Sequence, residues 1–384
     1  MLAPQPFFQP RGTPISVYFR LQALADMGHE VDLVTYHLGE DKHFPQVNIH
    51  RIPALFFIKK IKVGPSFAKI PMDFLLLCKS FRLLMSKSYD IIFSHEEASW
   101  FGTVLAKLKK IPHLYDMHSS LPQQLENFRF SRSKILKKIF LSLERYVLKN
   151  SKSIIVICPD LLQKLERENV AQKATLIENF LEFDHPDYTE ERIKKARMKH
   201  ASPEEKIVLY TGNFESYQGI PLFLEASAHV DEKSVVFLLV GGNPSHVDEM
   251  KKRASELKMT DRVRFTGQVS PSEVPLYIAM ADVLVSPRTA GTNTPLKIYS
   301  FLKSGKPVVA TNLWTHSQVL SEKISVLVDP DPKKFAEGIR FALNDPDAAA
   351  RAQMAKKMAE KEYTFDNYKK KINASLEKAL EAKI

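Results

Sequence analysis

The sequence predicts an α/β protein with two Rossmann-like parallel-sheet domains that face a cleft. Short apolar runs alternate with helical segments along most of the chain, which is typical of a parallel sheet covered on both faces. A polar stretch with little apolar periodicity interrupts this alternation, which then starts again. The 384 residues also exceed the size at which one core stays efficient. We therefore expect an N-terminal domain over residues 1–180, a linker over 181–206 and a C-terminal domain over 207–384 that includes the last helices.

The composition is that of a soluble globular protein, with 44% hydrophobic and 26% charged residues. Its two cysteines, far apart in apolar segments, suggest neither a disulfide framework nor a zinc site. No apolar run approaches the ~20 residues that span a bilayer, and no secretory leader is recognisable. We therefore expect a cytoplasmic protein.

Positive charge is concentrated in the first half of the chain. Residues 1–180 hold 25 lysines and arginines against 16 acidic residues, which is nine of the eleven net positive charges. This asymmetry favours an anionic acceptor, an anionic membrane surface or nucleic acid, although a solvated basic surface explains it equally well. The aromatic and lysine-rich segment Ala54–Lys69, which leads into an apolar helix, fits peripheral membrane contact and a core helix with solvated lysines equally well. No nucleic-acid motif is recognisable, so we expect no nucleic-acid partner.

The predicted elements of the first half form one β-loop-α-β series. The chain opens abruptly, with only the end of a first strand, which is compatible with a native chain that begins upstream. Further strands are predicted at Val31–Tyr36, Ile49–Ile52, Asp90–Ser94, Ile111–Asp116, Ser153–Cys158 and Thr175–Glu178. Helices are predicted at Ile15–Met27, Met72–Met85, Ala98–Lys110 and within Glu126–Asn150.

The second half repeats the same alternation. Its strands are predicted at Ile207–Tyr210, Val235–Val240, Val263–Phe265, Val283–Val285, Val308–Ala310 and Val326–Val328. Helices are expected between these strands, and the last ones are predicted at Lys333–Leu343, Asp347–Glu360 and Phe365–Ala382.

Polar residues follow two predicted strands of the first domain. His95 and Glu96 follow one strand, and His118 follows the next. The carboxyl ends of parallel strands gather at one edge of the sheet, where such folds bind ligands. His118 is a candidate general base, acceptor-hydroxyl ligand or phosphate contact, and a structural role stays open. The loop with Gly12 and Thr13 enters the first helix without a GxGxxG fingerprint, which disfavours a dinucleotide cofactor.

Three loops of the second domain follow strands and should reach one common edge. They are Thr211–Gly219, the loop that begins at Gly241, and Pro287–Pro295. The last of them enters a helix whose first turn carries Lys297. Free N–H groups and the positive helix dipole predict an anion site there, and phosphate suits it best. An ordinary strand–loop–helix crossover is the alternative.

The order of these pieces resembles the GT-B glycosyltransferases, and most closely the retaining family 4 (glycosyltransferase group 1). The resemblance covers nearly the whole chain. It is carried by GHEVDLVT (28–35), VLYTGNFESYQGIPLFLEA (208–226), FLLVGG (237–242), RVRFTGQVSPSEVPLYIAMADVLVSP (262–287) and PLKIYSFLKSGKPVVAT (295–311).

The resemblance implies an enzyme that transfers a sugar from a UDP- or GDP-linked donor to a glycan or lipid-linked acceptor. It implies a donor site in the C-terminal domain, an acceptor site in the basic N-terminal domain, and no cofactor or metal. The expected catalytic residues are His118 and Lys297, and His95 and Glu96 are acceptor-side candidates. The expected donor-binding residues are Gly12, Thr13, Asn213, Gln218, Gly241, Gly291, Thr292, Asn293, Thr294, Pro295 and Ser300.

The chain departs from the family pattern at four of these positions. Asn213 and Gln218 stand where relatives carry an arginine and a lysine that grip the diphosphate. Thr292 and Ser300 stand where relatives carry two glutamates. Charge-assisted hydrogen bonds are about twice as strong as neutral ones, so donor binding should be weaker or differently arranged. A catalytically impaired protein that binds a nucleotide sugar as a sensor or partner subunit, and a sugar-nucleotide epimerase, are the alternative functions.

Overall fold

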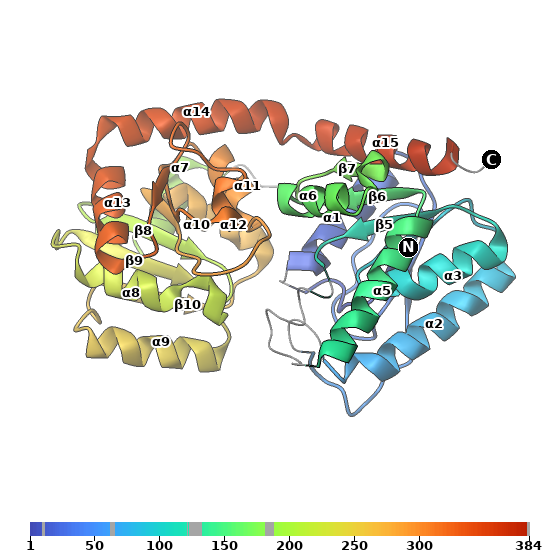
Figure 1. The fold of residues 1–384 in the computed structure, drawn as a ribbon. Coiled ribbons are helices and arrows are strands. Elements are labelled where there is room, and N and C mark those ends of the chain that lie inside the picture. The colour runs from blue at the N-terminus through green and yellow to red at the C-terminus, as the bar shows by residue number, and fades with distance from the viewer. Residues whose placement is uncertain (10–11, 62–65, 121, 123–132, 181–187, 382–384) are drawn as a thin grey trace. The chain divides into compact units, whose positions relative to one another are not determined.

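The computed structural model describes residues 1–9, 12–61, 66–120, 122, 133–180 and 188–381. The chain forms two compact units, each built on its own parallel sheet (Figure 1). Unit 1 comprises Met1–Phe180 together with Phe365–Ile384, and unit 2 comprises Leu181–Thr364. The α/β class with two Rossmann-like domains is thus confirmed.

The sheet of unit 1 has seven strands in the order β3-β2-β1-β4-β5-β6-β7, and all pairs are parallel. The strands are β1 (Leu2–Ala3), β2 (Val31–Thr35), β3 (Val47–Arg51), β4 (Ile92–His95), β5 (His113–Met117), β6 (Ser153–Val156) and β7 (Ala174–Leu176). The chain adds strands to one side of β1 and then to the other. The topological switch point, where ligands bind in open α/β sheets, therefore lies between β1 and β4.

The helices of unit 1 cover this sheet. They are α1 (Gly12–Asp26), α2 (Lys69–Ser86), α3 (Ala98–Lys109), α5 (Lys134–Asn150), α6 (Pro159–Arg167), the short 3₁₀ helix η1 (Ala171–Lys173) and α15 (Phe365–Glu381). The helix expected within residues 126–150 is α5, and the first part of that stretch lies outside the described residues. Buried residues of α2 and α3 pack against β1 and β2 in one apolar cluster.

The sheet of unit 2 has six parallel strands in the order β10-β9-β8-β11-β12-β13. They are β8 (Lys206–Thr211), β9 (Val235–Val240), β10 (Val263–Gly267), β11 (Val283–Ser286), β12 (Val308–Thr311) and β13 (Val326–Val328). Here the switch point lies between β8 and β11. The loops that follow these two strands lead to Asn213 and Lys297, so the fold itself brings the two regions together.

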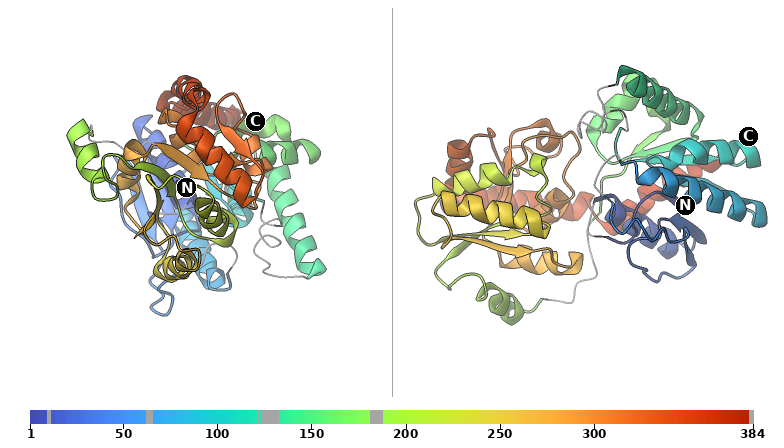
Figure 2. Two further views of the ribbon diagram at one scale, coloured as in Figure 1. Left: turned by 90° about the vertical axis from the view of Figure 1, so that its left-hand side faces the viewer. Right: turned by 90° about the horizontal axis from the view of Figure 1, so that it is seen from below.

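Alternate residues of each central strand of unit 2 enter opposite cores. Phe237 and Leu239 join one cluster, whereas Val236 and Leu238 join the other, so the sheet is covered on both faces (Figure 2). The helices of unit 2 are α7 (Glu190–Arg197), η2 (Ser216–Gln218), α8 (Ile220–Ala228), α9 (Pro244–Glu256), η3 (Pro271–Glu273), α10 (Val274–Met280), α11 (Lys297–Lys303), α12 (Trp314–Ser317), α13 (Pro332–Asn344) and α14 (Pro346–Glu362).

Two segments differ from the expected domain plan. The stretch expected to be a linker contains α7, a short charged helix that packs against α10. The last helix, α15, was expected in the C-terminal domain, but it packs on unit 1 against α1, β5, β6 and β7. Its buried stripe of Tyr368, Ile372 and Leu376 explains this docking. The residues of this stripe do not indicate which of the two sheets the helix covers.

Candidate functional site

Two histidines of unit 1, His95 and His118, lie together at the carboxyl ends of adjacent strands. β4 pairs with β5 so that His95 lies opposite Asp116, and His118 follows the end of β5. His95 Nδ1 lies 3.2 Å from His118 Nε2, and both residues are buried. Burial lowers the pKa of His95 to about 3, so this imidazole is neutral at neutral pH. The expected neighbours are thus in contact.

A buried ion pair between Arg20 and Asp116 lies next to these two histidines. Arg20 of α1 donates through Nε to Asp116 Oδ2 at 2.8 Å, and both side chains are 0% exposed. Asp116 Oδ1 lies 3.3 Å from His118 Nε2. Burial opposes ionisation of Asp116, but the charges of Arg20 and His118 outweigh it and place the pKa of Asp116 far below its ordinary value. The carboxylate can therefore orient the His118 ring.

His95, Asp116 and His118 are also residue types that bind a metal ion, and one ligand atom of each lies within 4.8 Å of the others. Asp116 already has a positive partner in Arg20, which brings a cation next to any metal placed there. The charge balance therefore favours a hydrogen-bonded network over a metal centre at this position.

Glu96 lies at the switch point of unit 1, next to the start of α1. Thr13 donates through Oγ1 to Glu96 Oε1 at 3.2 Å, while Gly12 begins α1 and is exposed. Burial raises the pKa of the Glu96 carboxyl, and the negative charge of Glu97 adds to that effect. Glu97 itself pairs with Lys69 at 2.7 Å. Thr13, expected on the donor side, is therefore in contact with an acceptor-side candidate.

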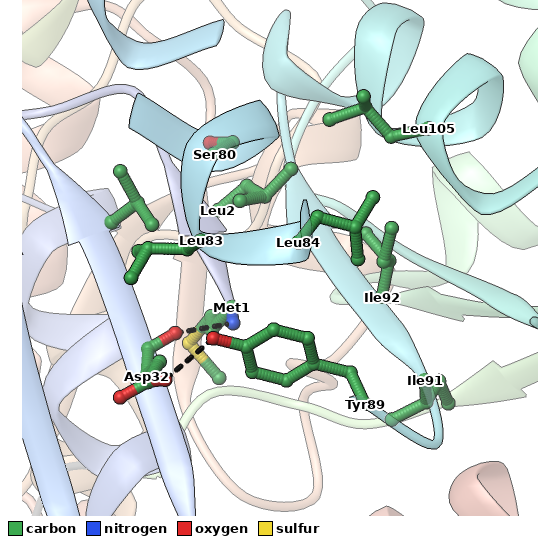
Figure 3. A pocket seen from close by; sticks show the side chains of 11 residues that line it. Met1, Leu2, Asp32, Ser80, Leu83, Leu84, Tyr89, Ile91, Ile92 and Leu105 are labelled. Carbon is green, nitrogen blue, oxygen red and sulfur yellow. Dashed lines mark hydrogen bonds between the residues drawn. The ribbon is translucent and has the colours of Figure 1, made fainter. Parts of the chain in front are cut away.

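The small cavity drawn in Figure 3 lies elsewhere in unit 1. It is lined by residues at the amino ends of β1, β2 and β4, among them Leu2, Asp32 and Ile92. Asp32 there accepts hydrogen bonds from Lys87 and Tyr89, so its charge is satisfied within the protein. His95 and His118 follow the opposite strand ends, and the cavity is not part of their site.

In unit 2, glycines allow three loops to touch at the switch point. A Cβ on Gly241 would lie 2.0 Å from the carbonyl oxygen of Gly212, and a Cβ on Gly219 would lie 1.8 Å from that of Pro287. All three glycines have positive φ angles. Thr289 also donates its N–H to the carbonyl of Tyr217 at 3.1 Å. The loops after β8, β9 and β11 thus meet as the strand positions predict.

Two cations are buried where these loops meet. Lys297 Nζ is buried without a hydrogen-bond partner among the described residues and lies 3.7 Å from the centre of the Tyr210 ring. Arg288 lies over the Tyr217 ring at 5.1 Å, and its Nε is also buried and unpartnered. Burial lowers the pKa of Lys297 well below its ordinary value, and the charge of Arg288 lowers it further. This pair of cations is a ready anion site.

The expected contribution of the helix N-terminus to an anion site stays a prediction. The helix that follows the loop, α11, has seven residues and begins at Lys297, so Lys297 lies in its first turn as expected. The side chains of Lys297 and Arg288 add two positively charged groups at this place. Sequence reasoning passed over Arg288, although it lies two residues beyond the end of β11, where the strand-end rule looks for ligands.

The loop between these cations is held by α12 and the residue after it. Arg288 Nη1 and Thr315 Oγ1 both donate to the carbonyl of Asn293, at 2.8 and 2.6 Å. Gln318 Nε2 donates to the carbonyl of Thr292 at 2.7 Å. The buried ring of His316 lies 2.8 Å from Ser286 Oγ and 2.9 Å from the carbonyl of Thr311, which ties the ends of β11 and β12 together. The loop is therefore braced before any ligand arrives.

The other expected donor residues lie in this loop, on α11 and on the loop after β8. Thr294 and Pro295 are buried, and the Thr294 hydroxyl has no partner among the described residues. Gly291 is exposed, with a φ angle of 113°. Ser300 is half-buried on α11. On the loop after β8, Asn213 is exposed, whereas Gln218 is buried with its Oε1 unpartnered.

Comparison with known proteins agrees with this fold. Residues 10–185 match the family described as Glycosyltransferase Family 4, and residues 192–363 match Glycosyl transferases group 1. The α-monoglucosyldiacylglycerol synthase of Streptococcus pneumoniae is 27% identical over 330 residues, which are 83% of this chain and 72% of that protein.

Solved structures show the same two-unit architecture. Sucrose-phosphate synthase from Thermosynechococcus elongatus superposes with a TM-score of 0.79 at 22% identity, covering 99% of this chain and 98% of its own. HepE from Anabaena, solved in complex with UDP-glucose, gives a TM-score of 0.75 at 18% identity, with 98% of each chain covered. At these identities the likeness shows the fold. Together with the two family matches, which span both units, it identifies the chain as a GT-B glycosyltransferase of the group 1, family 4 type.

Proposed function

We propose that this glycosyltransferase uses a UDP- or GDP-linked sugar as donor, retains the anomeric configuration and needs no metal ion. The observation that carries the proposal is the buried amino group of Lys297, which has no hydrogen-bond partner among the described residues; its charged form needs a counter-ion, which an anionic ligand would supply. The glycine-lined approach of three loops gives a phosphate close access to the backbone. The Anabaena neighbour bound to UDP-glucose supports a donor of this class.

The proposed reaction is a same-face substitution at the anomeric carbon. The bond between that carbon and the diphosphate oxygen breaks, and a bond to the acceptor oxygen forms. The acceptor proton passes to the departing phosphate, and a nucleoside diphosphate leaves. Lys297 balances the charge that develops on the phosphate, which is the role a metal has in other enzymes. His118, oriented by Asp116, positions the sugar or the acceptor hydroxyl.

The proposed acceptor is a glycan or a lipid-linked molecule, reached at an anionic membrane surface. The outer face of α2 exposes Ile70, Phe74, Phe81 and Met85, which share one helical stripe. The preceding loop exposes Phe56 and Phe57 next to Lys59 and Lys60. Exposed aromatic side chains beside lysines suit the boundary between lipid headgroups and acyl chains. The named activity of the pneumococcal relative, a glucosyldiacylglycerol synthase, fits such an acceptor. No helix among the described residues has the length and apolar character needed to cross a bilayer.

A donor screen tests the function. UDP- and GDP-sugars are assayed for thermal stabilisation and, with acceptors, for release of nucleoside diphosphate, before and after treatment with EDTA. We expect one base to stabilise the protein and turnover to survive EDTA, with the anomeric configuration of the product read by NMR. Lys297→Ala should lose donor binding, and His118→Ala should lose turnover more than binding. Lys333→Ala, an exposed lysine on α13, is the control. An absence of stabilisation by any nucleotide at millimolar concentration contradicts the proposal.

The same screen separates the two alternative functions. Binding without turnover over a broad acceptor panel is the result expected of a sensor or partner subunit. Conversion of the nucleotide sugar in the absence of acceptor is the result expected of an epimerase. The family matches favour transfer over both.

Vesicle sedimentation tests the membrane contact. We expect binding to vesicles that contain phosphatidylglycerol, weaker binding to pure phosphatidylcholine, and release by salt. Phe74→Asp should abolish binding, whereas Met354→Asp, at another exposed apolar position on α14 of unit 2, should not. Equal binding of the two variants would contradict the assignment of this face.

A further inference from the structure

The two cations of unit 2 each lie beside one of the neutral positions on the β8 loop. A Cβ on Gly212, the residue before Asn213, would lie 3.2 Å from Lys297 Nζ. The Arg288 guanidinium lies over the ring of Tyr217, the residue before Gln218. The family resemblance leads us to expect positive charges at positions 213 and 218, where this chain has none. Arg288, on the loop after β11, and Lys297, on α11, place positive charges next to these two positions.

We infer that Arg288 and Lys297 together bind the donor diphosphate, in place of the charged side chains that the family resemblance leads us to expect at positions 213 and 218. The inference rests on the proposed function and adds a residue, Arg288, and a division of labour to it. Lys297 supplies a point charge at the end of β8, and Arg288 supplies a guanidinium at the other end of the same loop.

The lack of counter-ions at Arg288 and Lys297 within the described part of the chain supports a ligand-binding role for these side chains over a purely structural one. Neither cation forms an ion pair with a carboxylate among the described residues, and Lys297 Nζ and Arg288 Nε are buried without partners. Each charge also disfavours the other, because Arg288 lowers the pKa of Lys297. A diphosphate would neutralise both charges and fill both hydrogen-bonding vacancies at once.

An alternative role for Arg288 has to be separated from this one. Its Nη1 donates to the carbonyl of Asn293 and lies 3.0 Å from the hydroxyl of Thr315, so the side chain also braces the loop. A brace alone would affect all ligands of the site alike. A phosphate contact affects only those ligands that carry the phosphates.

Binding of uridine, UMP, UDP and inorganic pyrophosphate to the full chain, measured by calorimetry, distinguishes the two roles. GDP and guanosine replace them if the guanine donor is the one that binds. For Arg288→Gln we expect at least a tenfold loss of affinity for the diphosphate and for pyrophosphate, with nucleoside affinity unchanged. Arg288→Lys should keep part of the affinity, because it keeps the charge but loses the fork. Equal losses for nucleoside and nucleoside diphosphate would overturn the inference in favour of a brace.

A rescue variant tests the spatial replacement itself. Asn213→Arg in a Lys297→Gln background should recover diphosphate affinity, because position 213 lies beside the vacated ammonium. Glu215→Arg, which places the same new side chain at another position of the same loop, should not. Rescue by both variants alike would indicate general attraction and contradict the inference. Circular dichroism confirms that each variant is folded.

Failure of the proposed function gives a different pattern. If the unmodified protein binds pyrophosphate through Arg288 and Lys297 but binds no nucleotide, the cation pair stands and the donor proposal falls. If it binds nucleoside diphosphates and Arg288→Gln changes nothing, the donor proposal stands and the role of Arg288 falls.

Discussion

The two units treat buried charge in opposite ways. In unit 1 the fully buried Arg20 is paired with Asp116 at 2.8 Å, and Lys69 is paired with Glu97. In unit 2 Lys297 Nζ and Arg288 Nε are buried without a hydrogen-bond partner, and neither side chain has a carboxylate counter-ion among the described residues, although Lys297 contacts the Tyr210 ring and Arg288 Nη1 donates to the Asn293 carbonyl. The buried cations Arg20 and Lys69 of unit 1 thus have counter-ions within the protein, although Arg20 Nη1 and Nη2 and Asp116 Oδ1 form no hydrogen bond among the described residues. In unit 2 the side chains of Lys297 and Arg288 lack a counter-ion in the described part of the chain, and a bound anion would supply one.

This contrast separates positioning from binding. A paired charge holds its neighbours in place, as Asp116 does for His118, and it changes little when a substrate arrives. An unpaired buried charge weakens the empty protein and is relieved by the ligand, so its cost is returned as affinity. This difference between the units can be tested in two ways. One is to remove the partner of a paired charge in unit 1, and the other is to remove an unpaired charged group in unit 2.

The largest effect is expected in unit 1. Asp116→Ala leaves Arg20 buried without its partner, and loss of one member of a buried pair costs about 3–5 kcal/mol. Urea unfolding measures this loss, and the two tryptophans allow each unit to be followed alone. Trp100 lies in α3 of unit 1 and Trp314 in α12 of unit 2, so Trp314→Phe leaves a probe of unit 1 only.

The control for Asp116→Ala is Asp366→Ala, an exposed acidic residue at the start of α15 in the same unit. Its ion pair with Lys369 is on the surface, so about 0–1 kcal/mol is expected. Equal destabilisation by the two variants would contradict the role given to the buried pair.

An effect of opposite sign is expected in unit 2. Lys297→Met replaces an unpartnered buried ammonium by an apolar chain of similar length, which should raise the stability of the ligand-free unit by about 1–3 kcal/mol. The contact with Tyr210 offsets part of the gain. The same variant should lose stabilisation by nucleoside diphosphate. Trp314 fluorescence in a Trp100→Phe background reports both results.

Lys333→Met, an exposed lysine on α13, is the matched control and should stay within about 0.5 kcal/mol of the parent protein. If Lys297→Met destabilises unit 2, the ammonium has a structural partner after all, and the contrast between the units is wrong.

The sequence predicts those features of the two sites that depend on where the strands end. Periodicity places His95, His118 and Lys297 after strands, and a parallel sheet gathers the loops at the carboxyl ends of its strands along one edge. Arg20 and Asp116 could not be paired in this way. They are 96 residues apart, on a helix and a strand whose contact is set by the tertiary fold.

The same limit explains the two differences from the expected domain plan. The apolar stripe of α15 shows that the helix is buried, but it holds no information on which of two sheets it covers. The stretch assigned to a linker is too polar to predict burial, yet its charged helix α7 has Thr189 as its N-cap and two glutamates in the first turn. Those capping signals predict a helix better than periodicity does here.

The pH dependence of stability should differ between the units. The depressed pKa of Lys297 means that the unfolded chain binds more protons than the folded one at any pH between the folded pKa and about 10.4. Stability of the ligand-free unit 2 should therefore rise with pH across this window. Asp116, whose pKa is also depressed, contributes stability above about pH 3.9 that is lost as the pH falls below that value.

Unfolding followed by Trp314 at pH 7, 8 and 9 tests this difference, with Lys297→Met expected to flatten the slope in unit 2. The Trp100 signal, followed as the pH is lowered through about 3.9, should show the acid-side loss, and the Asp116→Ala variant should lack it. If the stability of unit 2 falls between pH 7 and 9 in the parent protein but not in Lys297→Met, the pKa of Lys297 is raised on folding, and the prediction is contradicted.

The smallest effect, and the most direct link between the unpaired charge and its ligand, is proton uptake on donor binding. A diphosphate next to Lys297 favours the charged ammonium and raises its pKa, so binding near neutral pH should take up a fraction of a proton, at most one. Calorimetric binding enthalpies of UDP, or of GDP if that donor is the one bound, should therefore depend on the ionisation enthalpy of the buffer. Lys297→Gln should remove that dependence, while Arg288→Gln, which removes no titrating group, should retain most of it. Release of protons in place of uptake would mean that Lys297 is already charged in the empty site and that another group responds to the ligand.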